Sequence, residues 1–281
     1  MRIDLHSHST ASDGTDPPAE VVRHAGDARL DVVALTDHDT VAGHVAAAAA
    51  LPRGIALVPG AELSCAVDGA SLHLLAYLFD PDEPLLAGER FRLRTGRERR
   101  ARATVERLVA LGAELTWGDV LQVAGDAPVG RPHIARAMVA AGVVPDAASA
   151  FTPRWIGTGG RAYIPKYSLD PVRAVALVRG AGGVAVLAHP FAGVQGRSHP
   201  VATIRTLARA GLAGLEVDHP EHGPEARRRL RRLADELGVV ATGASDDHGT
   251  LTGHRLGCET TREEAYRRLI AQATGASVIY R

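Results

Sequence analysis

Residues 3–8 read Ile-Asp-Leu-His-Ser-His, a short apolar strand that runs directly into two histidines. Residues 32–38 repeat the arrangement as Val-Val-Ala-Leu-Thr-Asp-His, with polar residues again following an apolar strand. Between them, Asp16-Pro17-Pro18 starts a predicted helix that runs to about Ala28. A strand, a helix and a second strand in this order predict an α/β fold with a parallel sheet.

The same alternation continues along most of the chain. Further strands are predicted at 55–58, 72–78, 183–187, 212–217, 239–241 and 277–280, with helices such as 200–210 and 225–237 between them. We therefore expect a parallel sheet, either open or closed into a barrel.

The stretch 83–163 breaks this rhythm. It contains two predicted helices, 90–111 and 131–141, each ended by a glycine, and a glycine-rich loop at 151–161. We interpret it as a helical insertion into a body formed by residues 1–82 and 164–281.

Composition limits the possible functions. The 281 residues include 32 basic and 32 acidic side chains, a balance that argues against a nucleic-acid coat protein or a membrane-surface protein. The two cysteines, Cys65 and Cys258, form no metal-binding pair, which argues against a thiolate zinc site or a disulfide framework. No segment has the pattern of a signal peptide or a membrane span, so we expect a cytoplasmic protein.

Potential metal ligands stand where the predicted strands end. They include His6, His8, Asp37, His38, Glu62, His189, Glu216, Asp246 and His248. The carboxyl ends of strands in a parallel barrel converge on one face, so these side chains are expected to meet. His6 and His8 are two residues apart on an extended chain and can therefore chelate one ion, and Asp246 and His248 share that spacing.

A site of this composition suits phosphoester chemistry. Imidazole and carboxylate ligands without thiolate favour Mn²⁺, Fe²⁺ or Zn²⁺. A bridging carboxylate can hold two ions about 3.5–4 Å apart, and the ions lower the pKa of bound water until hydroxide forms near neutral pH. A serine or cysteine nucleophile is then unnecessary.

Four motifs together resemble the PHP (polymerase and histidinol phosphatase) superfamily. They are Asp4-Leu5-His6-Ser7-His8-Ser9, Thr36-Asp37-His38-Asp39, His189-Pro190 and Ser245-Asp246-Asp247-His248. The likeness covers nearly the whole chain and is greatest to stand-alone phosphoesterases that act on nucleoside 3′,5′-bisphosphates and short RNA. It implies a distorted (β/α)₇ barrel with a trinuclear metal centre, capped by the helical insertion.

The resemblance also implies a ligand set. His6, His8 and Asp246 would hold the first metal; Glu62 would bridge to a second, bound by His73 and His189; and Asp13, His38 and His248 would hold the third. Some relatives have histidine where this chain has Asp13, which predicts weaker binding of the third metal. The predicted nucleophile is a metal-bridging hydroxide held by Glu62 and Asp246, while Asp37, Glu216 and Asp247 would orient the ligands.

Substrate contacts are expected from the insertion and the segment after it. Arg131, His133 and Lys166 resemble residues that point towards substrate phosphate in such phosphoesterases. The alternative for Arg131 is a capping or pairing role on a helix surface. His219 is a further candidate for the pocket, whereas His24, His44, His199, His222 and His254 are assigned no role.

The leading functional prediction is removal of the 3′-phosphate from a nucleoside 3′,5′-bisphosphate, with 5′-to-3′ trimming of short RNA as a further activity. The alternatives are a cyclic phosphodiesterase, a histidinol-phosphate phosphatase and a non-catalytic, metal-binding PHP module. A DNA-binding role is excluded, since basic clustering and finger or helix-turn-helix motifs are missing. The expected partner is a small nucleotide or short oligonucleotide, with no stable protein partner and no membrane.

Overall fold

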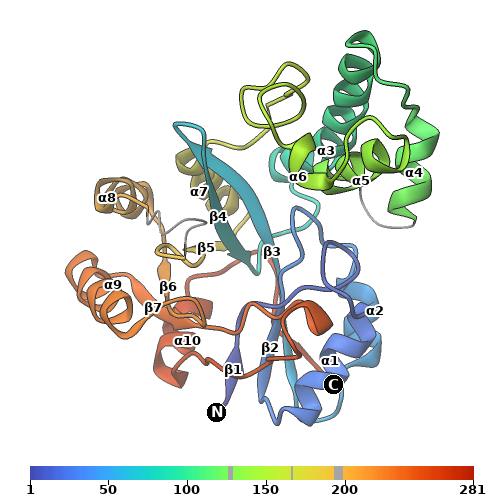
Figure 1. Cartoon of the computed structure of the whole chain (residues 1–281). Coiled ribbons are helices and arrows are strands. Elements are labelled where there is room, and N and C mark those ends of the chain that lie inside the picture. Colours follow the sequence, from blue (N-terminus) through green and yellow to red (C-terminus); the bar gives the residue numbers. More distant parts are fainter. Residues whose placement is uncertain (126–128, 166, 193–198) are drawn as a thin grey trace. The chain divides into compact units, whose positions relative to one another are not determined.

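The computed structural model describes residues 1–125, 129–165, 167–192 and 199–281. The strands are β1 (Ile3–Asp4), β2 (Val32–Leu35), β3 (Ala56–Val67), β4 (Ala70–Tyr77), β5 (Val184–Leu187), β6 (Gly214–Asp218), β7 (Val240–Gly243) and β8 (Ile279–Tyr280). The helices are α1 (Pro18–Asp27), α2 (His44–Ala50), α3 (Pro84–Ala110), α4 (Trp117–Ala124), α5 (Arg131–Ala140), α6 (Ala147–Ala150), α7 (Pro171–Gly180), α8 (Val201–Ala210), α9 (Pro224–Leu237) and α10 (Glu263–Ile270), with a 3₁₀ turn, η2 (Gly249–Leu251). Figure 1 shows their arrangement.

The strands form one sheet in the order β1-β2-β3-β4-β5-β6-β7, with β8 paired to β3. The segments that follow β1 and β7 meet at an isolated bridge between Ser7 and Asp247, where His8 N donates to Asp247 O at 2.8 Å. This contact brings the two ends of the sheet together into a nearly closed barrel. The prediction of a distorted (β/α)₇ barrel is confirmed.

The expectation of an all-parallel sheet was wrong for the middle of the barrel. Strand β4 runs antiparallel to both β3 and β5. The cause is a tight hairpin at Asp68 and Gly69, both of which have positive φ, 49° and 78°. Asp-Gly favours a type I′ turn, and a two-residue turn of this kind can join only antiparallel strands.

Strand β3 is also much longer than the predicted strand at 55–58. Residues 56–59 pair with β2, and residues 60–67 pair with β4. Pro59 and Gly60 predict a break, but here they mark the point where the strand changes partners. A side chain on Gly60 would approach Ala76 O to 2.8 Å, so glycine is needed where the strands lie closest.

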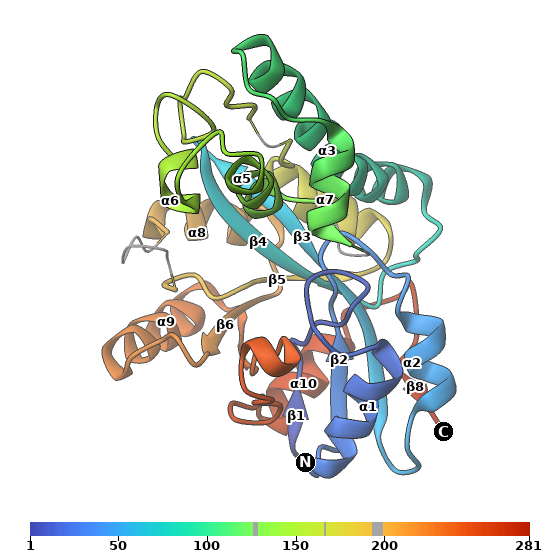
Figure 2. The same ribbon diagram turned by 45° about the vertical axis from the view of Figure 1, so that its right-hand side comes forward.

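Small aliphatic side chains fill the barrel. The interior cluster includes Leu5, Val58, Leu75 and Val186, and the Tyr77 hydroxyl reaches Leu5 O at 2.8 Å among them. A second cluster packs the apolar faces of α1 and α2 against β2 and β3. Figure 2 shows these two helices beside the two strands. Because aromatic residues are few, Ala, Val and Leu supply most of the buried core.

The chain forms two compact units, Met1–Phe91 with Ser168–Arg281, and Arg92–Tyr167, and the division falls within α3. The second unit has its own core, which includes Leu108, Ile134 and Met138. Helix α4 was not predicted, although Thr116 and Asp119 form a capping box at its start. The predicted insertion boundaries at 83 and 163, and its role as a cap, stay predictions.

Among the described residues, no helix combines the length and apolar character that a membrane crossing requires.

Candidate metal centre

The structure brings the nine predicted metal ligands together within the first unit. They come from the segments after β1, β2, β5 and β7 and from the interior of β3 and β4, and they are His6, His8, Asp13, His38, Glu62, His73, His189, Asp246 and His248. Glu62 and His73 lie within strands rather than at strand ends. The long β3–β4 hairpin supplies both of them.

Glu62 lies at the middle of this cluster, and only 1% of its surface is exposed. Its Oε2 faces His6 Nε2 at 3.3 Å, His8 Nε2 at 3.2 Å and His38 Nδ1 at 3.2 Å. Its Oε1 faces His73 Nδ1 at 2.9 Å and His189 Nε2 at 3.2 Å. One carboxylate thus separates two sets of imidazoles, the arrangement that a bridging ligand requires.

Asp246 has a similar position on the other side of His6 and His8. Its Oδ1 lies 3.2 Å from His6 Nε2 and 3.3 Å from His8 Nε2, and its Oδ2 lies 3.4 Å from His219 Nε2. Arg255 holds the backbone of Asp246 through a 2.8 Å bond to its carbonyl oxygen. His6, His8 and Asp246 can therefore bind one ion together.

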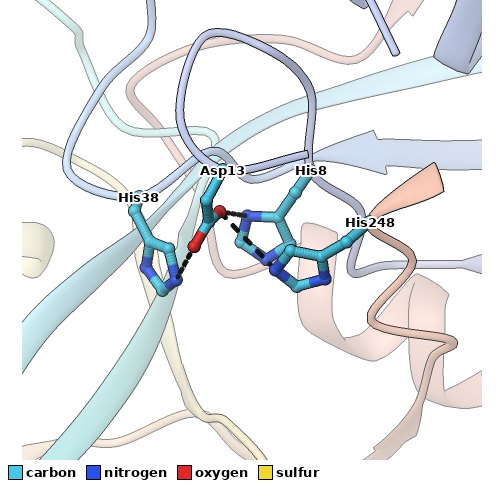
Figure 3. Close-up of side chains that lie close together, drawn as sticks. All are labelled: His8, Asp13, His38 and His248. Atoms are coloured by element: carbon cyan, nitrogen blue, oxygen red, sulfur yellow. Dashed lines mark ion pairs between the residues drawn. The ribbon is translucent and has the colours of Figure 1, made fainter. Parts of the chain in front are cut away.

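Asp13 lies among three histidines, as Figure 3 shows. Its Oδ1 is 3.6 Å from His8 Nδ1 and 3.5 Å from His248 Nε2, and its Oδ2 is 3.4 Å from His38 Nε2. The four side chains form a second potential ion site, and His38, Glu62 and His73 form a third. His8 and His38 each belong to two sites, so the sites adjoin.

The donor atoms fit divalent cations. His6 Nδ1 faces Glu216 Oε1 at 3.1 Å, so we place its proton there, which leaves the Nε2 lone pair directed at His8 Nε2, 3.0 Å away. Two buried imidazole nitrogens at this separation can share either a proton or a cation. The buried His38 Nδ1 lies 3.2 Å from Glu62 Oε2 but makes no hydrogen bond to any described residue, as expected of a ligand atom.

The electrostatics agree with this conclusion. Burial would lower the pKa of His8, but contacts with Asp246 and Glu62 outweigh it and raise that pKa to about 10. Burial, with the charges of His8 and His73, lowers the pKa of His38 to about 3, against the opposing effect of Glu62. The carboxylates therefore attract positive charge, which divalent ions can supply in place of protons.

Three further carboxylates, Asp37, Glu216 and Asp247, accept hydrogen bonds from the loops that carry the predicted ligands; their role in orienting metal ligands stays a prediction. Asp37 accepts from the Ser9 amide and hydroxyl, both at 2.7 Å, and from the Ser12 hydroxyl at 2.6 Å. Asp247 accepts from the Thr252 hydroxyl at 2.9 Å and from Arg255 N at 2.6 Å.

Glu216 supports two ligands at once, because its Oε2 also accepts from His189 N at 2.7 Å. Two residues of the cluster have unusual backbones: φ is +50° at Asp246 and +26° at His189. Such conformations cost about 1–3 kcal/mol each in non-glycine residues and concentrate at functional sites. The surrounding hydrogen bonds hold these residues in place.

Two residues beside the cluster, Asp4 and His219, support it; Asp4 was assigned no role from the sequence, and His219 was named only as a further candidate for the pocket. Asp4 is fully buried and accepts from Ser245 N at 3.0 Å and Gly257 N at 2.8 Å, which joins β1 to the loop after β7. Burial raises its pKa to about 6. The ring of His219 lies beside that of His189, with centroids 5.3 Å apart and planes tilted by 55°, and its Nε2 contacts Asp246. Its place after β6 was the only signal available.

The predicted substrate residues lie apart in the sequence from this cluster. Arg131 begins α5, with its guanidinium 5.8 Å from the rings of both Phe151 and Tyr163. His133 Nδ1 accepts from Gly130 N at 3.0 Å and so caps the same helix. Lys166 lies outside the described residues. The assignment of all three to substrate stays a prediction.

Comparisons with known proteins identify the family. A model of the PHP domain matches residues 4–109. The 3′,5′-nucleoside bisphosphate phosphatase of Chromobacterium violaceum is 34% identical over 260 residues, covering 90% of this chain and 89% of the relative. The chain belongs to the PHP family.

Two further PHP relatives are similar over most of their length. A 5′-3′ exoribonuclease of Haemophilus influenzae is 32% identical over 248 residues, covering 88% of this chain and 90% of the relative. A solved structure from Bifidobacterium adolescentis, described as a candidate metal-dependent phosphoesterase, superposes with a TM-score of 0.79 and 35% identity, covering 97% of this chain and 96% of the other. The similarity to these relatives thus extends along nearly the whole chain.

Proposed function

We propose that this protein is a metal-dependent phosphoesterase that hydrolyses phosphomonoesters. The observation that carries the proposal is Glu62, whose two carboxylate oxygens face separate sets of imidazoles, three on one side and two on the other. Its first substrate candidate is the 3′-phosphate of a nucleoside 3′,5′-bisphosphate, with short RNA degraded in the 5′-to-3′ direction as a further candidate. The names of the similar phosphatase and exoribonuclease support both.

The ligand assignment is the one that the family resemblance implies, and the side chains that lie close together support it. Three divalent ions, Mn²⁺, Fe²⁺ or Zn²⁺, would be held by His6 with His8 and Asp246, by Glu62 with His73 and His189, and by Asp13 with His38 and His248. When bound, such ions supply Lewis acidity that activates water and offsets the charge on phosphoryl oxygens. A nucleophile held by Glu62 and Asp246 is supported by the fact that both carboxylates face His6 and His8.

Two residues next to the predicted ligands, Glu216 and His219, would orient the ligands and carry a proton near them. Glu216 orients His6 and the backbone of His189, so both imidazoles keep their direction. His219 lies beside Asp246 Oδ2 at 3.4 Å and can hold or release a proton at its Nε2. Arg131 and His133 in the predicted cap, and Lys166 in the segment after it, would select the substrate. A cytoplasmic location stays a prediction.

Phosphate release from a panel of substrates tests the proposal. The full chain, loaded with Mn²⁺, Fe²⁺ or Zn²⁺ in turn, is offered a nucleoside 3′,5′-bisphosphate, a 5′-phosphorylated oligoribonucleotide, a cyclic sugar phosphate and histidinol phosphate. The bisphosphate should be hydrolysed fastest, and Asp246→Asn should abolish the reaction. Faster turnover of the cyclic ester or of histidinol phosphate would replace the substrate assignment. Bound metal without any turnover would favour a non-catalytic PHP module.

A further inference from the structure

A fourth group of potential metal ligands lies outside the central cluster. Asp16 precedes α1, His24 lies in the last turn of that helix, and His254 lies in the loop after η2. Among the described residues, these three form a set whose ligand atoms all lie within 4.8 Å of one another, and they share no member with the nine predicted ligands.

The distances are close to those of a bound ion. Asp16 Oδ2 is 3.1 Å from His24 Nδ1 and 3.3 Å from His254 Nδ1, and the two rings meet edge to face with centroids 5.1 Å apart. Zinc bonds of about 2.0–2.2 Å at tetrahedral angles place neighbouring donor atoms roughly 3.3–3.6 Å apart. Both imidazoles therefore approach one carboxylate oxygen closely enough for a single ion to bind all three side chains after a shift of a few tenths of an ångström.

The site is open on one side. The side chains of Asp16, His24 and His254 are 15%, 37% and 44% exposed. His24 and His254 also line a pocket of about 310 Å³ together with Asp27 and Leu256. Three protein ligands with access to solvent leave room for water or a small ligand to complete the coordination.

The backbone of His254 is held in an unusual conformation. Its φ is +52°, a region that histidine adopts at some cost, and its amide donates to Gly249 O at 2.9 Å. The next residue, Arg255, is fixed by bonds to Asp247 Oδ1 at 2.6 Å and to Asp246 O at 2.8 Å. The chain thus directs the imidazole of His254 towards Asp16 from a loop that also supports the central cluster.

We propose that Asp16, His24 and His254 form an additional zinc site that joins α1 to the loop after β7. Two imidazoles and one carboxylate favour a transition-metal ion over Mg²⁺ or Ca²⁺, and among the ions expected in the central cluster Zn²⁺ ranks highest for such donors. An ion here fixes the loop that follows Asp246 and His248. The proposal does not depend on the substrate or the activity of the central cluster.

The zinc content of three variants tests this site. His254→Gly removes the imidazole without backbone strain, since glycine accepts positive φ, and Asp16→Asn removes the carboxylate charge. Asp27→Asn is the matched control, because it changes a carboxylate on the rim of the same pocket but outside the triad. The full-length proteins are saturated with Zn²⁺, passed through a desalting column and analysed by inductively coupled plasma mass spectrometry.

Wild type and Asp27→Asn should each retain one more zinc per chain than His254→Gly and Asp16→Asn. When free Zn²⁺ is present at tenfold the dissociation constant of the additional site, zinc should raise the melting temperature of wild type by about 2–4 °C more than it raises that of His254→Gly. Equal zinc content in wild type, His254→Gly and Asp16→Asn would overturn the proposal and leave only a hydrogen-bonded contact. His8→Ala separates the two sites, since it should lower central metal content while the additional equivalent remains.

Discussion

Replacement of Glu216 by glutamine should weaken metal binding although Glu216 is not a predicted ligand. The side chain is fully buried and has two acceptor roles, Oε1 towards His6 Nδ1 at 3.1 Å and Oε2 towards His189 N at 2.7 Å. A backbone N–H can only donate, so the oxygen of the new amide has to stay with His189. The amide NH₂ group then faces His6 Nδ1.

This arrangement changes the proton position on His6. Either two donors oppose each other, or the proton moves to His6 Nε2, the atom that lies 3.3 Å from Glu62 and 3.2 Å from Asp246. A protonated Nε2 cannot bind a metal. Loss of a group that orients a ligand typically costs 10–100-fold in metal affinity, about 1.4–2.7 kcal/mol. We expect Glu216→Gln to lie in this range.

Calorimetric titration of metal-depleted protein with Mn²⁺ measures the effect. Asp218→Asn is the control, because it makes the same chemical change on the same strand but affects a pair with Arg231, whose guanidinium lies 2.7 Å from both carboxylate oxygens. The control should keep the wild-type dissociation constant. If Glu216→Gln binds Mn²⁺ within twofold of wild type, Glu216 does not set the tautomer of His6 and the reasoning is refuted.

Three other changes test the centre and its surroundings. His8→Ala removes a buried imidazole shared by two ion sites, so phosphate release should fall by at least about 100-fold and metal per chain should decrease; full activity would contradict the ligand assignment. In the metal-free protein the pKa of His8 is raised to about 10 from an ordinary value of 6.5, so its stabilising effect is complete below pH 6.5 and disappears as the pH rises through 10. The melting temperature of metal-free protein should therefore fall between pH 7 and 10. Bound metal takes the place of the proton and should remove most of that fall. If the melting temperatures of metal-free and metal-loaded protein change with pH in the same way, this linkage is refuted. Arg131→Ala should raise KM for the bisphosphate about tenfold with little change in kcat if Arg131 binds substrate phosphate, and an unchanged KM would leave it only its contacts with Phe151 and Tyr163.

The metal ligands at the strand ends were the part of the site that could be predicted best from the sequence. His6 and His8, or Asp246 and His248, follow apolar strands closely, so the convergence of their side chains required only the barrel geometry. Glu62 was expected at a strand end because Pro59 and Gly60 predict a break just before it, whereas His73 and the bridging role of Glu62 came only from the resemblance; both residues in fact lie inside β3 and β4.

The long-range polar contacts could not be predicted from the sequence. Asp4 reaches Ser245 and Gly257, more than 240 residues away, and nothing in its local sequence identifies these partners. The antiparallel course of β4 was missed for a different reason: Asp68-Gly69 is a strong hairpin signal, but Pro59-Gly60 hid the strand that leads to it. Where two local sequence signals conflict in this way, the pairing of the strands in the folded protein decides between them.

The contacts that close the barrel also position the metal ligands. The bridge between Ser7 and Asp247 joins the ends of the sheet, and it lies between His6 and His8 on one side and Asp246 and His248 on the other. An ion bound by His6, His8 and Asp246 therefore spans the same junction as the backbone bond from His8 to Asp247. Because a ligand that binds only the folded state stabilises it, an ion bound at this junction should stabilise the closed barrel. Loss of metal should accordingly loosen first the segments after β1 and β7, where hydrogen exchange can detect it.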